Sequence, residues 1–157
     1  MKSFDELKEV VRRLREPDGC PWDKEQTHSS LKPGCIEEAA EVICGINIYE
    51  KTGNSENLKE ELGDLLLQVM FHSVIAEEEG LFTFDDVARI VSEKMIRRHP
   101  HVFNGITFEN DEERKASWEK IKKAEKEGKE WTEQYLPSAF AEARELIGKA
   151  EERKGYK

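Results

Sequence analysis

The chain has 157 residues, of which 37% are hydrophobic and 38% are charged, and this length fits one ordinary domain. Its 25 Lys and Arg residues against 34 Asp and Glu residues give a formal net charge of −9. This charge argues against nucleic acid as a partner, because phosphate backbones are held by basic surfaces. No apolar run reaches the roughly 18–20 residues that span a bilayer, and no signal-peptide pattern opens the chain. Three cysteines without a CxxC pair disfavour a disulfide scaffold, so we expect a reduced, cytoplasmic protein with no membrane or nucleic-acid contact.

The composition predicts helices throughout, because Glu, Lys, Ala and Leu dominate and no alternating strand pattern stands out. Apolar residues recur at helical spacing from Phe4 to Leu14, Pro17 ends this first helix, and a polar loop is expected over 20–28. Further helices are expected over about 35–51, 55–79, 83–99, 112–127 and 138–153. We predict an all-α fold with a four-helix-bundle core in the first hundred residues and additional C-terminal helices.

The helix expected over 35–51 carries carboxylates in an otherwise apolar setting. At 100° per residue, Glu41 lies about 40° and Glu38 about 100° from Glu37, and most of the remaining circumference is apolar. No Lys or Arg falls between residues 35 and 49, whereas a solvated helix face pairs its acids with bases at i+4. We therefore expect these carboxylates on a mostly buried helix.

The helix expected over 55–79 repeats this pattern. Four polar side chains lie within about 80° of one another on one face: Glu61, Asp64, Gln68 and His72. Gly63 in mid-helix costs about 1 kcal/mol relative to Ala, so we expect another backbone to approach closely there. Antiparallel packing of the two helices would bring their acidic stripes together.

Carboxylates that cluster in this way need a counter-charge. At an effective dielectric of 20, two of them about 7 Å apart repel by about 2.4 kcal/mol. The ten pairs among five such acids cost on the order of 20 kcal/mol, more than a marginally stable domain carries. The five acids are Glu37, Glu38, Glu41, Glu61 and Asp64. Either they are protonated, or the stripes do not meet, or divalent cations lie between them, and all-oxygen ligands favour Mg²⁺ or Mn²⁺.

Basic and aromatic residues follow on the later helices. Lys94 and Arg98 are i,i+4 neighbours at the end of an apolar stripe, where a phosphate group can use them, and we prefer this role to a structural salt bridge. Trp118 and Lys122 repeat the same spacing on the next helix.

The acidic residues also follow a recognisable order. Glu37-Glu38-x-x-Glu41 is followed by Glu61-x-x-Asp64, and the flanking segments are 19–28, 60–66 and 97–103. This arrangement resembles the EExxE…ExxD metal motif and its surroundings in the MazG family of nucleoside triphosphate pyrophosphohydrolases, over about residues 4–125. The resemblance places a MazG-like domain at residues 1–125 and a C-terminal helical extension at 126–157.

The resemblance implies an all-α homodimer that uses Mg²⁺ to hydrolyse a nucleoside triphosphate to the monophosphate and pyrophosphate. The rest of the chain offers too little surface to cover the long apolar helices, and this also favours self-association. The resemblance further implies that the five acids hold metal, with one as base; we choose Glu38, which is set apart from its neighbours on the helix, and expect Glu41 to be essential for catalysis. The resemblance also implies that four residues stand at positions that contact the nucleotide in that family: Lys94, Arg98, Trp118 and Lys122. Lys94 and Arg98 would steady the departing pyrophosphate.

Two other functions remain open. A di-iron carboxylate oxidoreductase built in a helix bundle needs two Glu-x-x-His pairs, but Val69 stands three residues before His72. A non-catalytic helical protein whose acidic stripes bind a basic partner predicts exposed carboxylates and indifference to Mg²⁺.

Overall fold

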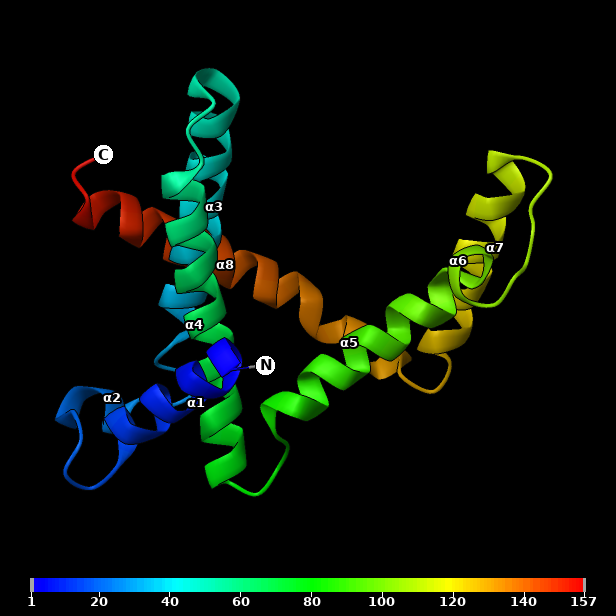
Figure 1. Cartoon of the computed structure of the whole chain (residues 1–157). Coiled ribbons are helices and arrows are strands. Elements are labelled where there is room, and N and C mark those ends of the chain that lie inside the picture. The colour runs from blue at the N-terminus through cyan, green and yellow to red at the C-terminus, as the bar shows by residue number, and fades with distance from the viewer. Residues whose placement is uncertain (1, 157) are drawn as a thin grey trace. The chain divides into compact units, whose positions relative to one another are not determined.

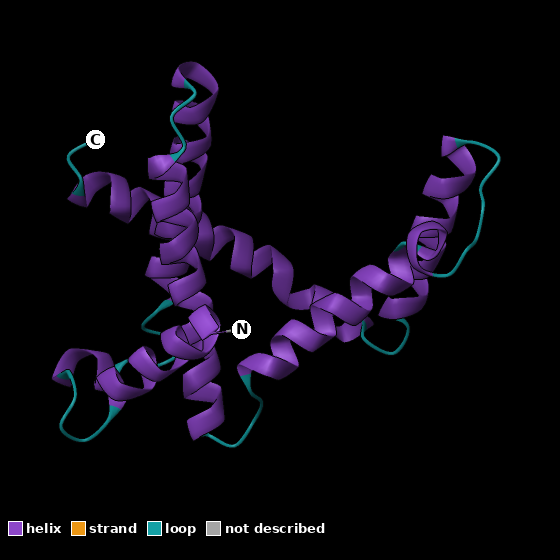
Figure 2. Cartoon of the chain, in the orientation of Figure 1, coloured by secondary structure: helices purple, strands orange, loops and turns teal. Residues whose placement is uncertain are grey.

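The computed structural model describes residues 2–156, and within them the regular secondary structure is entirely helical (Figures 1 and 2), which confirms the all-α class. The elements are α1 (Lys2–Arg15), α2 (Pro21–Glu25), α3 (Lys32–Thr52), α4 (Glu56–Glu78), α5 (Phe84–Arg98), α6 (Pro100–Phe103), α7 (Asp111–Lys126), the 3₁₀ helix η1 (Glu130–Tyr135) and α8 (Leu136–Arg153). None of the described helices combines the length and the apolar character needed to cross a membrane.

The six longer helices were all predicted, with ends within a few residues of those observed. The loop expected over 20–28 is wrong in part, because α2 forms inside it with Pro21 in its first turn, where proline needs no amide partner. Gly53 ends α3 as predicted: its φ of 74° is left-handed, and its amide bonds the carbonyl of Tyr49 at 2.8 Å.

The described chain divides into two compact units. The first unit contains the chain up to Phe84 and again from Ala141 onward, and the second is Asp85–Phe140. Most of α5, the fourth helix of the predicted bundle, thus falls in the second unit, and its Ile90 and Val91 are about half exposed. The functional division into residues 1–125 and 126–157 stays a prediction.

The first unit is built on an antiparallel pair, in which α3 and α4 run side by side from the turn at Gly53 (Figure 1). α1 packs on the C-terminal half of α4. The core that results consists of Val11, Leu31, Met70, Phe71, Val74 and Ile75.

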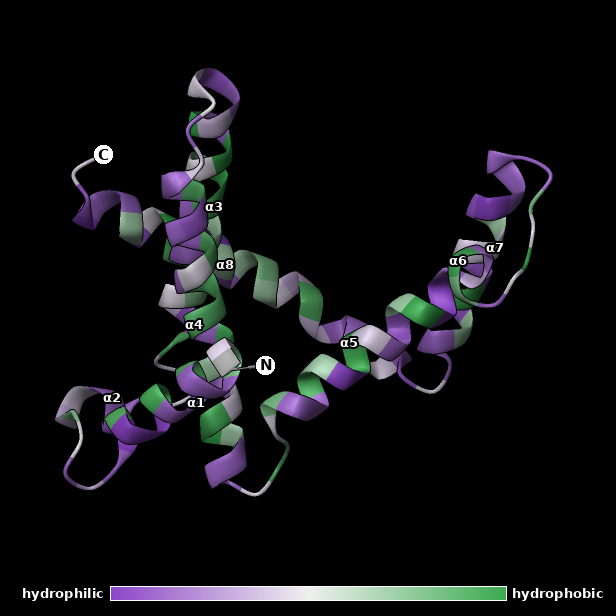
Figure 3. Ribbon diagram, viewed as in Figure 1, coloured by the Kyte–Doolittle hydropathy of each residue, from purple (hydrophilic) through white to green (hydrophobic). Residues whose placement is uncertain are grey.

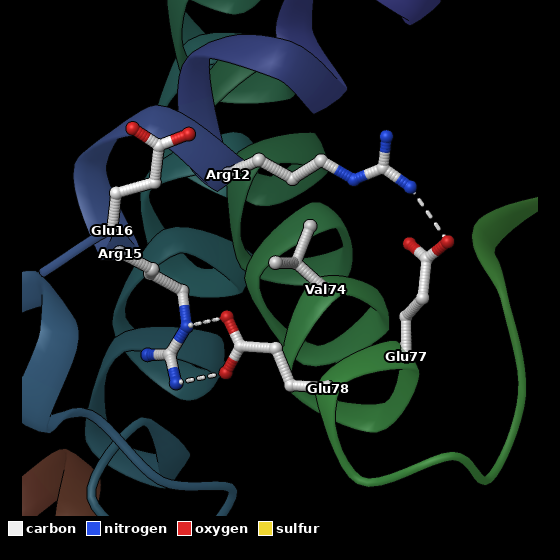
Figure 4. A pocket seen from close by; sticks show the side chains of 6 residues that line it. All are labelled: Arg12, Arg15, Glu16, Val74, Glu77 and Glu78. Carbon is white, nitrogen blue, oxygen red and sulfur yellow. Dashed lines mark hydrogen bonds and ion pairs between the residues drawn. The ribbon is translucent and has the colours of Figure 1, made fainter.

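Ion pairs fasten α1 to α4 at the same place (Figure 4). Arg12 bonds Glu77 at 2.6 Å, and Arg15 bonds Glu78 at 2.8 Å, on the border of a pocket of about 340 Å³. Arg15 also donates to the carbonyl oxygen of Asp23 at 2.7 Å, and only 7% of its side chain is exposed. This buried guanidinium therefore holds α1, α2 and α4 together.

The prediction that both acidic helices are mostly buried is wrong for the single chain. In α3 only Gly45 is fully buried, and in α4 full burial is confined to the stretch 70–76, which α1 covers. Hydrophobic residues continue along both helices beyond the core (Figure 3), and 60% of Ile43 and 50% of Leu62 are exposed. No second layer of the described chain covers this part of the pair tightly.

The close approach expected at Gly63 is also wrong for the single chain. A Cβ atom at Gly63 would meet no heavy atom within 4 Å beyond the adjacent residues and backbone of its own helix. On α3, in contrast, a Cβ atom at Gly45 would lie 2.8 Å from the Cα atom of Leu58, and one at Gly34 would lie 2.9 Å from Oε1 of Gln68. The small residues that let α3 and α4 approach each other therefore lie on α3.

Candidate active site

Three carboxylates from α3 and α4 meet in the first unit. Glu38 comes from α3, while Glu61 and Asp64 lie one turn apart on α4. One carboxylate oxygen from each residue lies within 4.8 Å of the others, so the two acidic stripes do meet at these residues. The donor set consists of oxygen atoms alone, which is the set that hard divalent cations prefer. The three side chains fit such an ion, and their role as ligands stays a prediction.

Glu38 lies at the electrostatic centre of this cluster. Its pKa is raised, first by burial and then by the charges of Glu41, Asp64, Glu61 and Glu37. A carboxylate in this position holds a proton more readily than an exposed one, and a cation placed beside it would reverse the effect.

Asn57 orients one of the three carboxylates. Its side-chain Nδ2 donates to Oε1 of Glu61 at 2.8 Å, across one turn of α4. Its Oδ1 is buried and accepts no hydrogen bond among the described residues. The contact leaves Oε2 of Glu61 open to another partner.

Glu37 and Glu41, the other two predicted ligands, have basic partners on the C-terminal part of the chain. Arg153 of α8 and the adjacent Lys154 both pair with Glu37, and Lys154 also pairs with Glu41. The hydrogen bond from Arg153 is the main reason that the pKa of Glu37 is lowered. Neither carboxylate belongs to the 4.8 Å cluster in this conformation, and their role as metal ligands stays a prediction.

A cavity of about 400 Å³ lies beside these acids, between α3, the start of α4 and the last part of α8. Ile36, Ile48 and Ile147 give it apolar walls. Its polar lining includes Glu41, Glu61 and Lys154.

The predicted phosphate-binding residues lie in the second unit. Arg98 makes two bonds to one oxygen of Glu125, at 2.7 and 2.9 Å, and its guanidinium carbon lies 5.4 Å from the ring centre of Trp118. Lys122 pairs with Glu119 at 3.2 Å. The structure thus brings Arg98 and Trp118 into contact, with Arg98 in a salt bridge that the sequence did not predict. Lys94 lies on α5, four residues before Arg98.

Another pocket opens beside Trp118, with a volume of about 470 Å³. The rings of His99 and Trp118 form a T-shaped pair with centroids 4.9 Å apart, and Arg114, Lys115 and Glu119 complete the lining. Both bases also pair with Asp111 on the same helix.

His72 continues the polar stripe of α4, but its partners are not carboxylates. Its Nδ1 lies 2.7 Å from Nδ1 of His28, and its Nε2 lies 3.3 Å from Sγ of Cys35. Burial and then His28 lower the pKa of His72. These contacts tie both ring nitrogens into a hydrogen-bonded group, which disfavours the di-iron alternative.

Sequence reasoning missed several residues at the site. Asn57 stands four residues before Glu61, and this helical spacing was a usable signal. Arg153 and Lys154 gave no such signal, because they lie 116 and 113 residues from the acids they contact. Glu125 gave no local signal either, because it lies 27 residues from Arg98.

Comparison with known proteins agrees with the spacing of the acids. A family model described as the MazG nucleotide pyrophosphohydrolase domain matches residues 26–103, which include Glu37, Glu38, Glu41, Glu61 and Asp64.

Three curated relatives match most of this chain. The nucleoside triphosphate pyrophosphohydrolase/pyrophosphatase MazG of Thermotoga maritima is 51% identical over 78% of this chain and 45% of its own length. The nucleoside triphosphate pyrophosphohydrolase of Escherichia coli K12 is 45% identical over 80% of this chain and 47% of its own length. The YabN protein of Bacillus subtilis is 50% identical over 78% of this chain and 24% of its own length. The chain spans less than half the length of each of these relatives, and it belongs to the MazG nucleotide pyrophosphohydrolase family.

Proposed function

We propose that this chain hydrolyses nucleoside triphosphates to the nucleoside monophosphate and pyrophosphate, with Mg²⁺ or Mn²⁺ as cofactor. The observation that supports this most directly is the convergence of Glu38, Glu61 and Asp64. The relatives from T. maritima and E. coli are both named nucleoside triphosphate pyrophosphohydrolases.

The acidic residues have two roles in this proposal, which are metal binding and proton transfer. Five carboxylates would hold the cation: Glu37, Glu38, Glu41, Glu61 and Asp64. When it is bound, the cation neutralises triphosphate charge and makes a bound water more acidic. Glu38, which lies between the carboxylates of α3 and those of α4, accepts the proton of the attacking water. The water oxygen bonds to phosphorus, and the anhydride bond to pyrophosphate breaks with its electron pair on the leaving group.

The basic and aromatic side chains of the second unit bind the substrate. Arg98 offers a planar guanidinium that Glu125 and Trp118 hold in place, and with Lys94 it steadies the departing pyrophosphate. Trp118 and Lys122 contact the nucleotide.

We further propose that the protein is a homodimer. The exposed apolar residues of α3 and α4, among them Ile43 and Leu62, lie outside the core of one chain. Two copies that face each other through these helices form a four-helix bundle and bury the apolar surface.

The alternative of a non-catalytic acidic protein has less support. It requires exposed carboxylates, whereas Glu37, Glu38, Glu41 and Glu61 are all partly buried. It also does not explain why three of the acids converge.

The test is the release of pyrophosphate from a panel of nucleoside triphosphates, with and without Mg²⁺, and with the nucleoside product identified. Asp64→Asn should lower kcat by at least 100-fold, whereas Glu60→Gln, its control on the exposed side of α4, should retain the wild-type rate. Full activity of Asp64→Asn, or full activity in the presence of a chelator, would contradict the proposal.

A further inference from the structure

The end of α8 and the residue that follows it bring two positive charges onto the acidic residues of α3. Arg153 pairs with Glu37, and Lys154 pairs with both Glu37 and Glu41. The two partners come from distant parts of the chain and lie within one compact unit. The two acids are therefore neutralised by the protein itself.

Side-chain ion pairs rather than tight packing hold this part of α8 in place. Toward the start of the helix, Glu142 pairs with Lys32 of α3 at 2.9 Å, and both side chains are about half exposed. Between the two sets of ion pairs, Ile147 borders the cavity of about 400 Å³, and no residue of α8 is fully buried. The side chains of Lys32, Glu142 and Arg153 are about half exposed or more, and ion pairs of exposed groups contribute little stability, so this docking is easily reversed.

The same carboxylates cannot serve α8 and a cation equally well. A divalent ion needs carboxylate oxygens at roughly 2.0–2.6 Å, which brings its charge against whatever positive group already contacts them. An ammonium and a guanidinium at hydrogen-bonding distance from these acids would then face a second positive charge a few ångströms away. Docking of α8 therefore disfavours metal binding, and metal binding disfavours docking of α8.

We propose that Arg153 and Lys154 form an internal counter-cation that occupies Glu37 and Glu41 in the metal-free protein, and that divalent metal binding displaces it. The inference rests on the proposed function in one respect, that Glu37 and Glu41 belong to the metal site. Docked α8 lowers the apparent affinity for metal, and bound metal releases the end of α8. Thermodynamic linkage makes these two effects equal in free energy.

The first test measures metal binding without substrate. Mg²⁺ is titrated calorimetrically into the full chain and into the double variant Arg153→Gln/Lys154→Gln. We expect the variant to bind metal about five- to tenfold more tightly, because the competing charges are gone. The matched control is Arg144→Gln/Lys149→Gln, which removes two positive charges from the same helix; neither side chain lines the cavity or pairs with Glu37 or Glu41. Its affinity should stay within twofold of the wild type.

The second test separates displacement from a general effect of charge. Hydrogen exchange of residues 145–154 is measured in the wild-type chain as Mg²⁺ is added. Displacement predicts faster exchange at the end of α8, and this change should be absent in Asp64→Asn, which lacks one ligand. Unchanged exchange at saturating Mg²⁺ would overturn the proposal, as would equal metal affinity in the wild type and the double variant.

These outcomes also separate the inference from the function on which it rests. If the wild type binds Mg²⁺ and releases pyrophosphate while α8 neither weakens binding nor responds to it, only the counter-cation is overturned. If neither the wild type nor the double variant binds Mg²⁺, the metal centre is overturned together with the inference.

Discussion

The Nδ1 atoms of His28 and His72 lie 2.7 Å apart, and the two imidazole rings stack with an interplanar angle of 4°. One proton serves both nitrogens, so the contact is lost when both rings carry a charge. His28 lies in the segment before α3, and His72 lies on α4. The pair therefore joins the segment that leads into α3 to α4.

This pair predicts a loss of stability in mild acid. The pKa of His72 is lowered by burial and by His28, so the unfolded chain takes up a proton at a higher pH than the folded chain does. The free energy of unfolding should therefore fall as the pH drops below about 6.5, the ordinary histidine value, toward the lower pKa of folded His72. Urea unfolding between pH 8 and pH 5 measures this, and His72→Gln should flatten the dependence. Parallel curves for the two proteins would contradict the assignment.

Glu38→Gln is expected to stabilise the metal-free protein. Because the pKa of Glu38 is raised, the folded state binds its proton more tightly than the unfolded state, and stability falls as the pH rises above about 4.3 through that raised pKa. At pH 7 the neutral amide removes the cost of burying this charge and its repulsion from the neighbouring carboxylates, and a gain of about 1 kcal/mol corresponds to roughly 2–4 °C in Tm for a chain of this size.

We expect Mg²⁺ to raise the Tm of the wild type, and the same variant should lose this rise. Glu60→Gln, an exposed neighbour of the cluster, serves as the control and should change neither quantity. A metal-free Glu38→Gln protein that melts at or below the wild-type temperature would contradict the electrostatic interpretation.

Asn57→Ala should weaken metal binding without removing a ligand. The amide holds Oε1 of Glu61, and loss of such an orienting hydrogen bond typically costs about 10–100-fold in metal affinity. The concentration of Mg²⁺ needed for half-maximal rate should rise, while kcat at saturating Mg²⁺ recovers to near the wild-type value. Lys59→Gln changes an exposed residue of the same helix and should shift neither. A fall in kcat with an unchanged Mg²⁺ requirement would exclude an orienting role.

Gly45→Ala is expected to destabilise the first unit. The added methyl group would lie 2.8 Å from the Cα atom of Leu58, a backbone atom, so α3 and α4 must move apart at a cost of about 1–3 kcal/mol. Gly148→Ala is the matched control, because nothing lies within 4 Å of a Cβ atom there. In α8 the greater helix propensity of alanine should leave stability unchanged or raise it by up to about 1 kcal/mol. Equal effects of the two substitutions in chemical denaturation would show that the helices do not approach closely at Gly45.

Most of the secondary structure could be predicted from patterns of residues that are close together in the sequence. Proline and glycine mark the helix ends, and the acidic residues at positions 37, 38, 41, 61 and 64 follow helical spacing. Because α3 and α4 are joined by a short turn at Gly53, their antiparallel pairing and the convergence of Glu38 with Asp64 follow from the spacing and the turn.

The sequence by itself thus determined the six longer helices, the turn between α3 and α4, and the spacing of the acidic side chains along both helices, because each depends on residues close together in the chain. Only the tertiary structure decided that Gly45 rather than Gly63 lies at the close approach, and that Arg153 and Lys154 contact Glu37 and Glu41. Periodicity gives the direction of a side chain around its own helix, but the partner that it meets depends on how distant helices pack. No local pattern records that packing.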